Sequence, residues 1–325
     1  MREATHDVLG VGNAIVDIIA QTDDAFLETH GMAKGGMALI DEARAHALYA
    51  DMGSAIEASG GSAANTIAGV ASFGGRAAFI GKVRDDEFGR IFGHDLTSLG
   101  VHFTTPPATS GAATARCLVL VTADAQRTMN THLGACVDLT PADIDTDLVA
   151  ASTITYLEGY LFDPPAAKEA FRKAATVARG AGRKVALTLS DSFCVHRYKD
   201  EFKQLIDEHI DILFANEAEI EALYDSRDIA AAADDLAGRV GVAAITRSEK
   251  GSLLISGDER VTVPAAPIEE LVDTTGAGDL YAAGVLYGLS RQHALAECGR
   301  LGSLAAAEVI QHYGARPLQP LGSLA

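Results

Sequence analysis

The sequence has few basic residues: 26 Lys and Arg stand against 44 Asp and Glu, which gives a formal net charge of −18. A chain with this charge repels polyanions, so nucleic acid and anionic membrane surfaces are not expected as partners. A protein this acidic must gather positive charge locally if it binds phosphate groups. Each Arg or Lys near a glycine-rich loop is therefore informative.

Three other signals are missing. The four cysteines, Cys117, Cys136, Cys194 and Cys298, have no C-x-x-C spacing, so we expect buried free thiols in a reducing cytoplasm. The histidines lack metal-ligand spacing, which disfavours a zinc site. No apolar run follows a basic start, and every long apolar stretch has polar breaks, so we expect neither secretion nor a membrane span.

The 325 residues are enough for a substantial core, and they show no internal repeat, low-complexity segment or linker. From about residue 150, strand and helix patterns alternate regularly. The expected elements are strand 153–157, helix 165–181, strand 184–189, helix 197–208, strand 211–214, helices 216–224 and 228–240, and strand 242–246. This alternation predicts a parallel sheet covered on both faces, with ligands at the carboxyl ends of its strands.

The remaining patterns are less regular. The expected strands are 7–12, 14–20, 34–39, 101–104, 115–122 and 128–133, the expected helices are 42–49, 62–73, 86–99 and 292–310, and residues 251–263 form a hairpin. We read the whole chain as one domain.

One stretch, D-T-T-G-A-G-D at residues 273–279, leads into a small-residue helix. Gly276 and Gly278 each cost about 0.5–1 kcal/mol relative to alanine in a helix. They permit an anion to approach bare backbone amides at the positive end of the helix dipole. Asp279 then adds an acid beside that site, which suits phosphoryl transfer. Alternatively, Asp279 serves the helix dipole alone and G-A-G is a tight loop.

Two further patterns lie in the first quarter of the chain. In G-N-x-x-x-D, Asn13 is followed by Asp17, a lone acid inside an apolar strand that needs a partner or a ligand. Gly60 and Gly61 precede a helix that carries Asn65, and such a pair forms a hinge and admits a ligand close to the backbone. The plainer interpretations are a turn Asn, an edge-strand Asp and an ordinary Gly-Gly loop.

These motifs resemble the ribokinase-like (PfkB) family of sugar and nucleoside kinases. The resemblance implies an α/β fold with three layers, α/β/α (Rossmann-like, mostly parallel), and a small inserted β-sheet lid from roughly 13–41 and 101–133. It implies that Asp279 is the catalytic base and that the amides of Gly276, Ala277 and Gly278 form an anion hole. It also implies that Asp17, Gly61 and Asn65 bind substrate hydroxyls, with Asn13 and Gly60 beside them. Arg127, at a hairpin turn, is either a solvated residue or the family's phosphate contact.

The resemblance also implies ATP and Mg²⁺ as cofactors. The expected nucleotide contacts are Asn216, Thr246, Ser248, Gly251, Thr275 and Gly278. Glu219, in the family's N-x-x-E motif, is expected to hold Mg²⁺ through water, although Asn216 and Glu219 would equally serve as a helix cap. Ser248 stands where the family usually has glycine. K⁺ is a further cofactor that some members need, near the backbone of Asp273 and Thr275.

Within the family, G-N-A-I-V-D, L-S-D-S-F, D-I-L-F-A-N-E-A-E and the tail at 302–317 look like the adenosine kinase branch. This predicts phosphorylation of a nucleoside 5′-hydroxyl, adenosine first, by a cytoplasmic monomer. The residues expected to form an apolar purine slot are Leu39, Leu133 and Phe193, with Met37 and Phe162 as further candidates.

Three alternatives stay open. The first is a sugar kinase of the same family, and the second is a non-catalytic nucleoside-binding protein. The third is a dinucleotide-binding dehydrogenase, which predicts G-x-G-x-x-G after the first strand. Gly10-Val11-Gly12 is followed by Asn13, Ala14 and Ile15, so the third glycine is missing.

Overall fold

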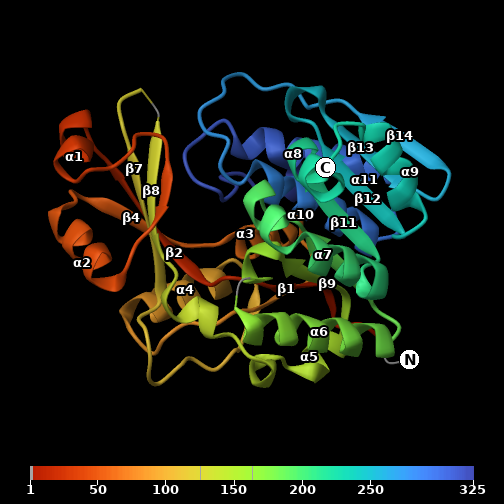
Figure 1. The fold of residues 1–325 in the computed structure, drawn as a ribbon, viewed down its shortest axis with the longest axis horizontal. Helices are drawn as coiled ribbons and strands as arrows, with labels where there is room; N and C mark the ends of the chain where they lie inside the picture. Colours follow the sequence, from red (N-terminus) through yellow and green to blue (C-terminus); the bar gives the residue numbers. More distant parts are fainter. Residues whose placement is uncertain (1–2, 125, 163) are drawn as a thin grey trace.

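A computed structural model describes residues 3–124, 126–162 and 164–325. A large sheet forms the centre of the molecule, in the order β14-β13-β12-β11-β10-β9-β1-β5-β6 (Figure 1). Its strands are β1 His6–Val11, β5 Ala77–Ile80, β6 His102–Phe103, β9 Ser152–Glu158, β10 Lys184–Thr188, β11 Ile212–Asn216, β12 Val242–Thr246, β13 Ser252–Ser256 and β14 Glu259–Val263. All neighbours from β12 to β6 are parallel, and only β13 and β14 pair antiparallel.

Helices cover both faces of this sheet. One face packs against α5 Thr146–Ala150, α6 Pro165–Gly180, α7 Ser192–His209, α8 Glu217–Tyr224 and α9 Ile229–Ala237. The other packs against α3 Ser62–Ser72, α4 Glu87–Ser98, α10 Ala277–Ser290 and α11 Leu295–Val309. Successive residues of β1 point to opposite faces of the sheet. Leu9 and Val11 pack in the core with the first group of helices, whereas Val8 packs in the core with the second. This is why the strands read as continuous apolar runs.

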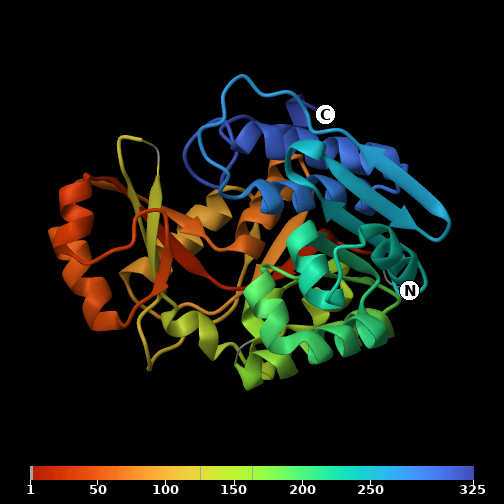
Figure 2. The same ribbon diagram turned by 45° about the horizontal axis from the view of Figure 1, so that its top comes forward.

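A second sheet projects to one side of the large sheet, at the left of Figures 1 and 2. It has the order β3-β8-β7-β2-β4, with β2 Ile15–Gln21, β3 Met37–Leu39, β4 Ala55–Gly60, β7 Ala115–Val121 and β8 Arg127–His132. Its outer face is covered by α1 Asp24–Thr29 and α2 Glu42–Asp51. The chain enters this sheet from β1 and returns to the main body through Gly61 into α3.

The expected three-layer architecture with a small inserted sheet is confirmed, but the expected bounds of that sheet need correction. Residues 55–60 form β4 within it, although A-I-E-A-S-G carries little strand signal. Conversely, His102 and Phe103 pair with β5 in the large sheet, so the second contribution begins at β7 rather than at residue 101. The turn expected at 124–127 includes Ala125, which lies outside the described residues.

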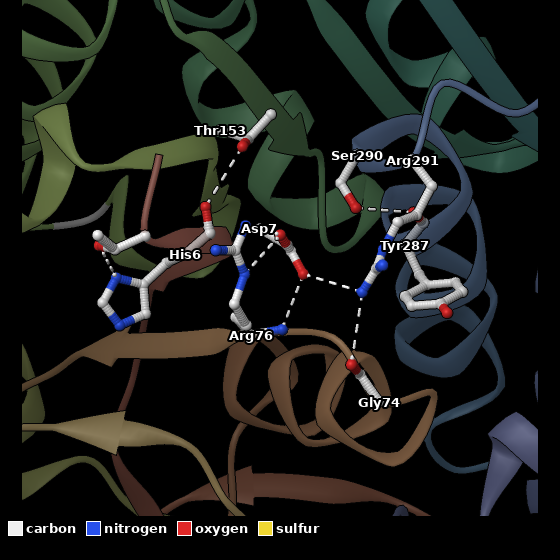
Figure 3. Close-up of polar contacts among 9 residues, drawn as sticks. His6, Asp7, Gly74, Arg76, Thr153, Tyr287, Ser290 and Arg291 are labelled. Atoms are coloured by element: carbon white, nitrogen blue, oxygen red, sulfur yellow. Dashed lines mark hydrogen bonds and ion pairs between the residues drawn. The ribbon is translucent and has the colours of Figure 1, made fainter. Parts of the chain in front are cut away.

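At the amino-terminal end of β1, ion pairs connect the strand to its neighbours (Figure 3). Asp7, buried at that end, accepts hydrogen bonds from the Arg76 guanidinium at 2.6 and 3.1 Å, and Arg291 approaches it at 3.2 Å. Burial by itself raises the pKa of Asp7, but the bonds from Arg76 outweigh it and hold that pKa below its ordinary value. Within the described part of the chain, no helix is long and apolar enough to cross a membrane.

Candidate active site

A cavity of about 430 Å³ lies between the small sheet and the carboxyl ends of the central strands. The small sheet contributes Ile15, Asp17, Ile19, Cys117, Val119, Arg127, Met129 and Thr131, and α3 contributes Ser62 and Asn65 after Gly61. The main body contributes Tyr160, Thr188, Ser190, Phe214, Ala215, Asn216, Glu219, Thr246, Thr275, Gly276, Gly278, Asp279, Tyr281, Gly314 and Ala315. Parallel α/β sheets bind ligands at this edge, as the sequence predicts.

Asp279 lies in the first turn of α10, and two donors from α3 fix its carboxylate. Ser62 Oγ donates to Oδ1 at 2.6 Å and Asn65 Nδ2 donates to Oδ2 at 2.9 Å. Burial raises the pKa of Asp279, while these two bonds and the charge of Arg316 oppose the rise. The result is an oriented carboxylate on the cavity wall, which is what a proton acceptor requires.

The backbone before Asp279 provides anion donors. Gly276 adopts φ 79°, and a Cβ there would lie 2.7 Å from Cβ of Ala315, so only glycine fits. The expected anion hole needs a partial correction at Ala277, because the Ala277 amide already donates a hydrogen bond to the Thr274 carbonyl at 3.2 Å. Among the described residues, the Gly278 and Asp279 amides have no acceptor. A Cβ at Gly278 would meet open space, so a ligand can reach these two donors.

Arg127 brings positive charge into the cavity from the small sheet. Its guanidinium lies 2.5 Å from Asp273 Oδ2 and 5.7 Å from the ring of Tyr313. Both partners of this ion pair are buried, and Asp273 also accepts from the Thr275 amide at 3.0 Å. The pair therefore links the small sheet to the start of the D-T-T-G-A-G-D segment.

Asp17 faces the same cavity from β2. A Cβ at Gly60 would overlap its carboxylate, so the expected Gly60 acts by making room for Asp17 rather than by lining the cavity. Burial raises the pKa of Asp17 to about 6; the charges of Arg316 and Arg127 oppose this, and Asp279 adds to it. Gly61 and Asn65 do line the cavity, as expected for substrate contacts.

Asn13 lies beside the cavity without lining it. Its Nδ2 donates to Glu158 Oε1 at 2.7 Å, and Glu158 Oε2 accepts from the Ala63 amide at 2.8 Å. Glu158 therefore supplies the cap that α3 lacks, because Gly61 at the N-cap has no side chain. Burial raises the pKa of Glu158 to about 7, although the bonds from Ala63 and Asn13 oppose the rise. No motif in the sequence singles out Glu158.

Only some of the residues expected to contact a nucleotide lie in the cavity wall. Asn216, Thr246 and Thr275 line the cavity with Glu219, whereas Ser248 and Gly251 do not. Ser248 adopts φ 52°, the left-handed conformation that suits the glycine expected at this position.

Glu219 is part of a helix cap as well as the cavity wall. Its Oε2 accepts from the Asn216 amide at 3.0 Å, and the Glu219 amide donates to Asn216 Oδ1 at 2.9 Å, which together form the capping box of α8. Glu219 Oε1 also accepts from Asn216 Nδ2 at 2.7 Å. Burial raises the pKa of Glu219 to about 7. Of the residues that the structure describes, no three His, Cys, Asp or Glu side chains converge on one point. This fits Mg²⁺, which binds through one or two carboxylates, water and substrate phosphates rather than a full protein cage.

The apolar wall differs from the expected purine slot. Leu39, Met37 and Phe193 are exposed (62, 56 and 74%), and none of them, nor Leu133, lines the cavity. Phe162 stacks on Phe202 in the core, 4.6 Å between ring centroids.

On the inner face of the small sheet, the apolar residues that line the cavity are Ile15, Ile19, Cys117, Val119 and Met129. The main body adds Phe214, Ala215 and Ala315. The sequence could have indicated two of them. Ile15 and Ile19 lie two residues either side of Asp17, and alternate residues of a strand share a face.

Comparisons with known proteins agree with this geometry. The family model for pfkB family carbohydrate kinases matches residues 51–321. Adenosine kinase from Sinorhizobium meliloti is 55% identical with a TM-score of 0.91, covering 99% of this chain and 98% of that chain. A probable sugar kinase protein from Rhizobium etli CFN 42 is 50% identical with the same TM-score and the same coverage. Adenosine kinase of Saccharomyces cerevisiae is 26% identical over 95% of this chain and 96% of its own length.

Proposed function

The chain belongs to the pfkB family of carbohydrate kinases, and from this premise we propose that it transfers the γ-phosphoryl group of ATP to the 5′-hydroxyl of adenosine. Its class is that of a phosphotransferase acting on a hydroxyl group. The observation that carries the proposal is the position of Asp279. It lies between two hydrogen-bond donors from α3 and the unpaired amides at the start of α10.

The mechanism assigns a step to each of these groups. Asp17, Gly61 and Asn65 bind the ribose hydroxyls as the small sheet closes as a lid. Asp279 accepts the 5′-hydroxyl proton while that oxygen attacks the γ-phosphorus; the bond from the γ-phosphorus to the bridging β–γ oxygen breaks, and ADP leaves. The Gly278 and Asp279 amides, with Arg127, stabilise the negative charge that develops on the phosphoryl oxygens.

The nucleotide is bound by other residues. ATP with Mg²⁺ supplies the phosphoryl group and neutralises part of its charge. Asn216, Thr246 and Thr275 are the proposed nucleotide contacts, and Glu219 holds the ion through water. A K⁺ ion near the backbone of Asp273 and Thr275 stays a prediction.

Two observations favour a nucleoside over a sugar phosphate. The inner face of the small sheet offers a flat apolar wall, which suits a purine ring. Arg127 is the one basic side chain among the described residues that line the cavity, and it is already paired with Asp273. A phosphorylated sugar would need further cations. The 55% identical adenosine kinase supports the same choice, and it suggests a role in purine salvage in the cytoplasm.

A neutral sugar is the second candidate, because the 50% identical neighbour is described as a probable sugar kinase. Ribose would meet Asp17 and Asp279 in the same way but would leave the apolar wall uncovered. That difference makes the two candidates separable by kcat/KM.

The test is ATP consumption with adenosine, inosine, guanosine, cytidine, ribose, fructose and fructose 6-phosphate, each with and without K⁺. Adenosine should give the highest kcat/KM, with AMP as product. The matched control is 5′-deoxyadenosine, which fills the same wall but has no acceptor oxygen and should give no turnover. Preference for ribose or fructose would overturn the substrate, and turnover with none of them would overturn the proposed activity.

A further inference from the structure

Arg316, from the segment after α11, reaches the turn that joins β4 to α3. Its Nε and Nη2 donate to the Ser59 carbonyl at 3.1 and 2.8 Å, and Nη2 also donates to Ser59 Oγ at 2.8 Å. Its Nη1 donates to the Ala64 carbonyl at 2.5 Å. Ser59 lies at the end of the small sheet and Ala64 in the first turn of α3. One guanidinium therefore spans the junction between the small sheet and the main body.

The positions of Asp17 and Asp279, two of the acids that line the cavity, depend on this junction. The Asp17 carboxylate fits against Gly60, and Ser62 and Asn65 hold Asp279. The Ser59 amide is fixed from the other side by Asp95 Oδ2 at 2.8 Å. A shift of this turn would move Asp17 and Asp279 relative to each other.

We propose that Arg316 is a positioning residue for phosphoryl transfer: it clamps the β4–α3 turn and sets a fixed positive charge behind Asp17 and Asp279. The inference rests on the proposed function, since it concerns how that site holds Asp17 and Asp279 in position and in their charged form. Among the described residues, no carboxylate forms an ion pair with Arg316, whose hydrogen bonds go to Ser59 and Ala64. The acids whose charges act on Arg316 are Asp95, Asp17 and Asp279.

The groups around Asp17 and Asp279 determine how the charge of Arg316 changes the pKa of each acid. Asp279 faces Arg316 and the acids Asp17 and Glu158, with the phenols of Tyr156 and Tyr160 beside them.

Asp17 faces Arg316, Arg127 and Asp279, with the Cys117 thiol beside it. Burial lowers the pKa of Arg316 to about 10, so it stays charged at neutral pH. Removing its charge would raise the pKa of both carboxyls further and leave fewer base-competent molecules at a given pH.

The experiment measures kcat and kcat/KM across pH for the wild type and three variants. The acidic limb is the low-pH part of the kcat/KM profile, where activity falls as the carboxylates take up protons. Arg316→Gln keeps amide donors but loses the charge, and it should move the acidic limb to higher pH by about one unit. Arg316→Lys keeps the positive charge but loses the planar guanidinium and its paired donors. The acidic limb of its pH profile should stay at the wild-type pH, while its kcat on the plateau should fall several-fold. The control, Arg76→Gln, removes a guanidinium at the far end of β1 (Figure 3) and should move neither quantity.

A purely structural role predicts something else: Arg316→Gln would lower activity equally at every pH, with no movement of the limb. That result, or a limb displaced equally in the Lys variant, would overturn the proposal. If the Gln variant does not fold, the Lys variant decides, because an unchanged plateau contradicts the clamp and a shifted limb contradicts the charge. A wild type inactive on every acceptor refutes the proposed function instead.

Discussion

At the scale of single residues, the site depends on where glycine is required and where it is merely tolerated. Gly276 is required by its backbone angle and by Ala315. Gly278 has ordinary helical geometry and open space beside it, so the fold alone does not demand glycine there. The proposed anion site gives a reason for glycine at this position, because a ligand can approach the Gly278 amide closely.

This distinction predicts opposite effects on stability and activity. Gly278→Ala should leave the melting temperature equal to or above the wild-type value, because alanine favours a helix by about 0.5–1 kcal/mol. The new methyl group would displace the phosphoryl group, and kcat/KM should fall about 10- to 100-fold. Gly276→Ala, the matched control, should lose stability as well. Unchanged activity in Gly278→Ala would show that no anion binds at this turn.

At the scale of elements, the regular β/α half was predictable because buried parallel strands and amphipathic helices have strong, different periods. The small sheet was harder, since the sequence A-I-E-A-S-G of β4 carries little strand signal and ends in Gly60. The expected slot residues Leu39 and Phe193 failed to line the cavity because a resemblance gives positions along the chain, not the direction in which side chains point. Arg316 bonds Ser59 from 257 residues away, a contact that local sequence cannot signal.

Helix α3 has an unusual cap, which predicts a pH effect. The pKa of Glu158 is about 7 in the folded protein, above its ordinary value of 4.5. The folded state therefore binds its proton more tightly, and this contribution to stability is present below about pH 4.5 and lost as pH rises to about 7. In Glu158→Gln, the urea midpoint should fall less steeply between pH 5 and 7.5 than in the wild type.

The remaining slope in that variant belongs to Asp17, Glu219 and Asp279, whose pKa values burial also raises. The exposed Glu259→Gln variant serves as the control and should keep the full wild-type slope. If Glu158→Gln also keeps that slope, Glu158 does not titrate as described.

At the scale of the whole molecule, the charges of the candidate active site and the ion pairs of Asp7 lie at opposite ends of β1. The chain leaves the carboxyl end of β1 toward Asp17, while Asp7 with Arg76 and Arg291 fastens the other end (Figure 3). Gly12 follows Asp7 by five residues along the strand direction, a distance of about 16 Å. Stability and activity should therefore be separable by mutation.

Asp7→Asn should lower the free energy of unfolding at pH 7 by about 1–3 kcal/mol, because buried charged hydrogen bonds are lost. The turnover number should not change. The pKa of Asp7 is lowered in the folded protein, so its contribution is present above pH 3.8 and lost as pH falls further. Urea unfolding at pH 7 and pH 3 should show the gap between variant and wild type shrinking at the lower pH. A gap independent of pH would contradict the ion-pair account.

The measurement that tests the central claim most directly is kcat of Asp279→Asn with adenosine and Mg-ATP, alongside its melting temperature. Asparagine keeps the shape of the side chain and can still accept a hydrogen bond from Ser62, but it cannot take a proton. We predict that kcat falls about 10²- to 10⁴-fold, with little change in KM and no loss of melting temperature, since burial disfavours the charge of Asp279. A variant that keeps kcat within a few-fold of the wild type would show that Asp279 is not the base.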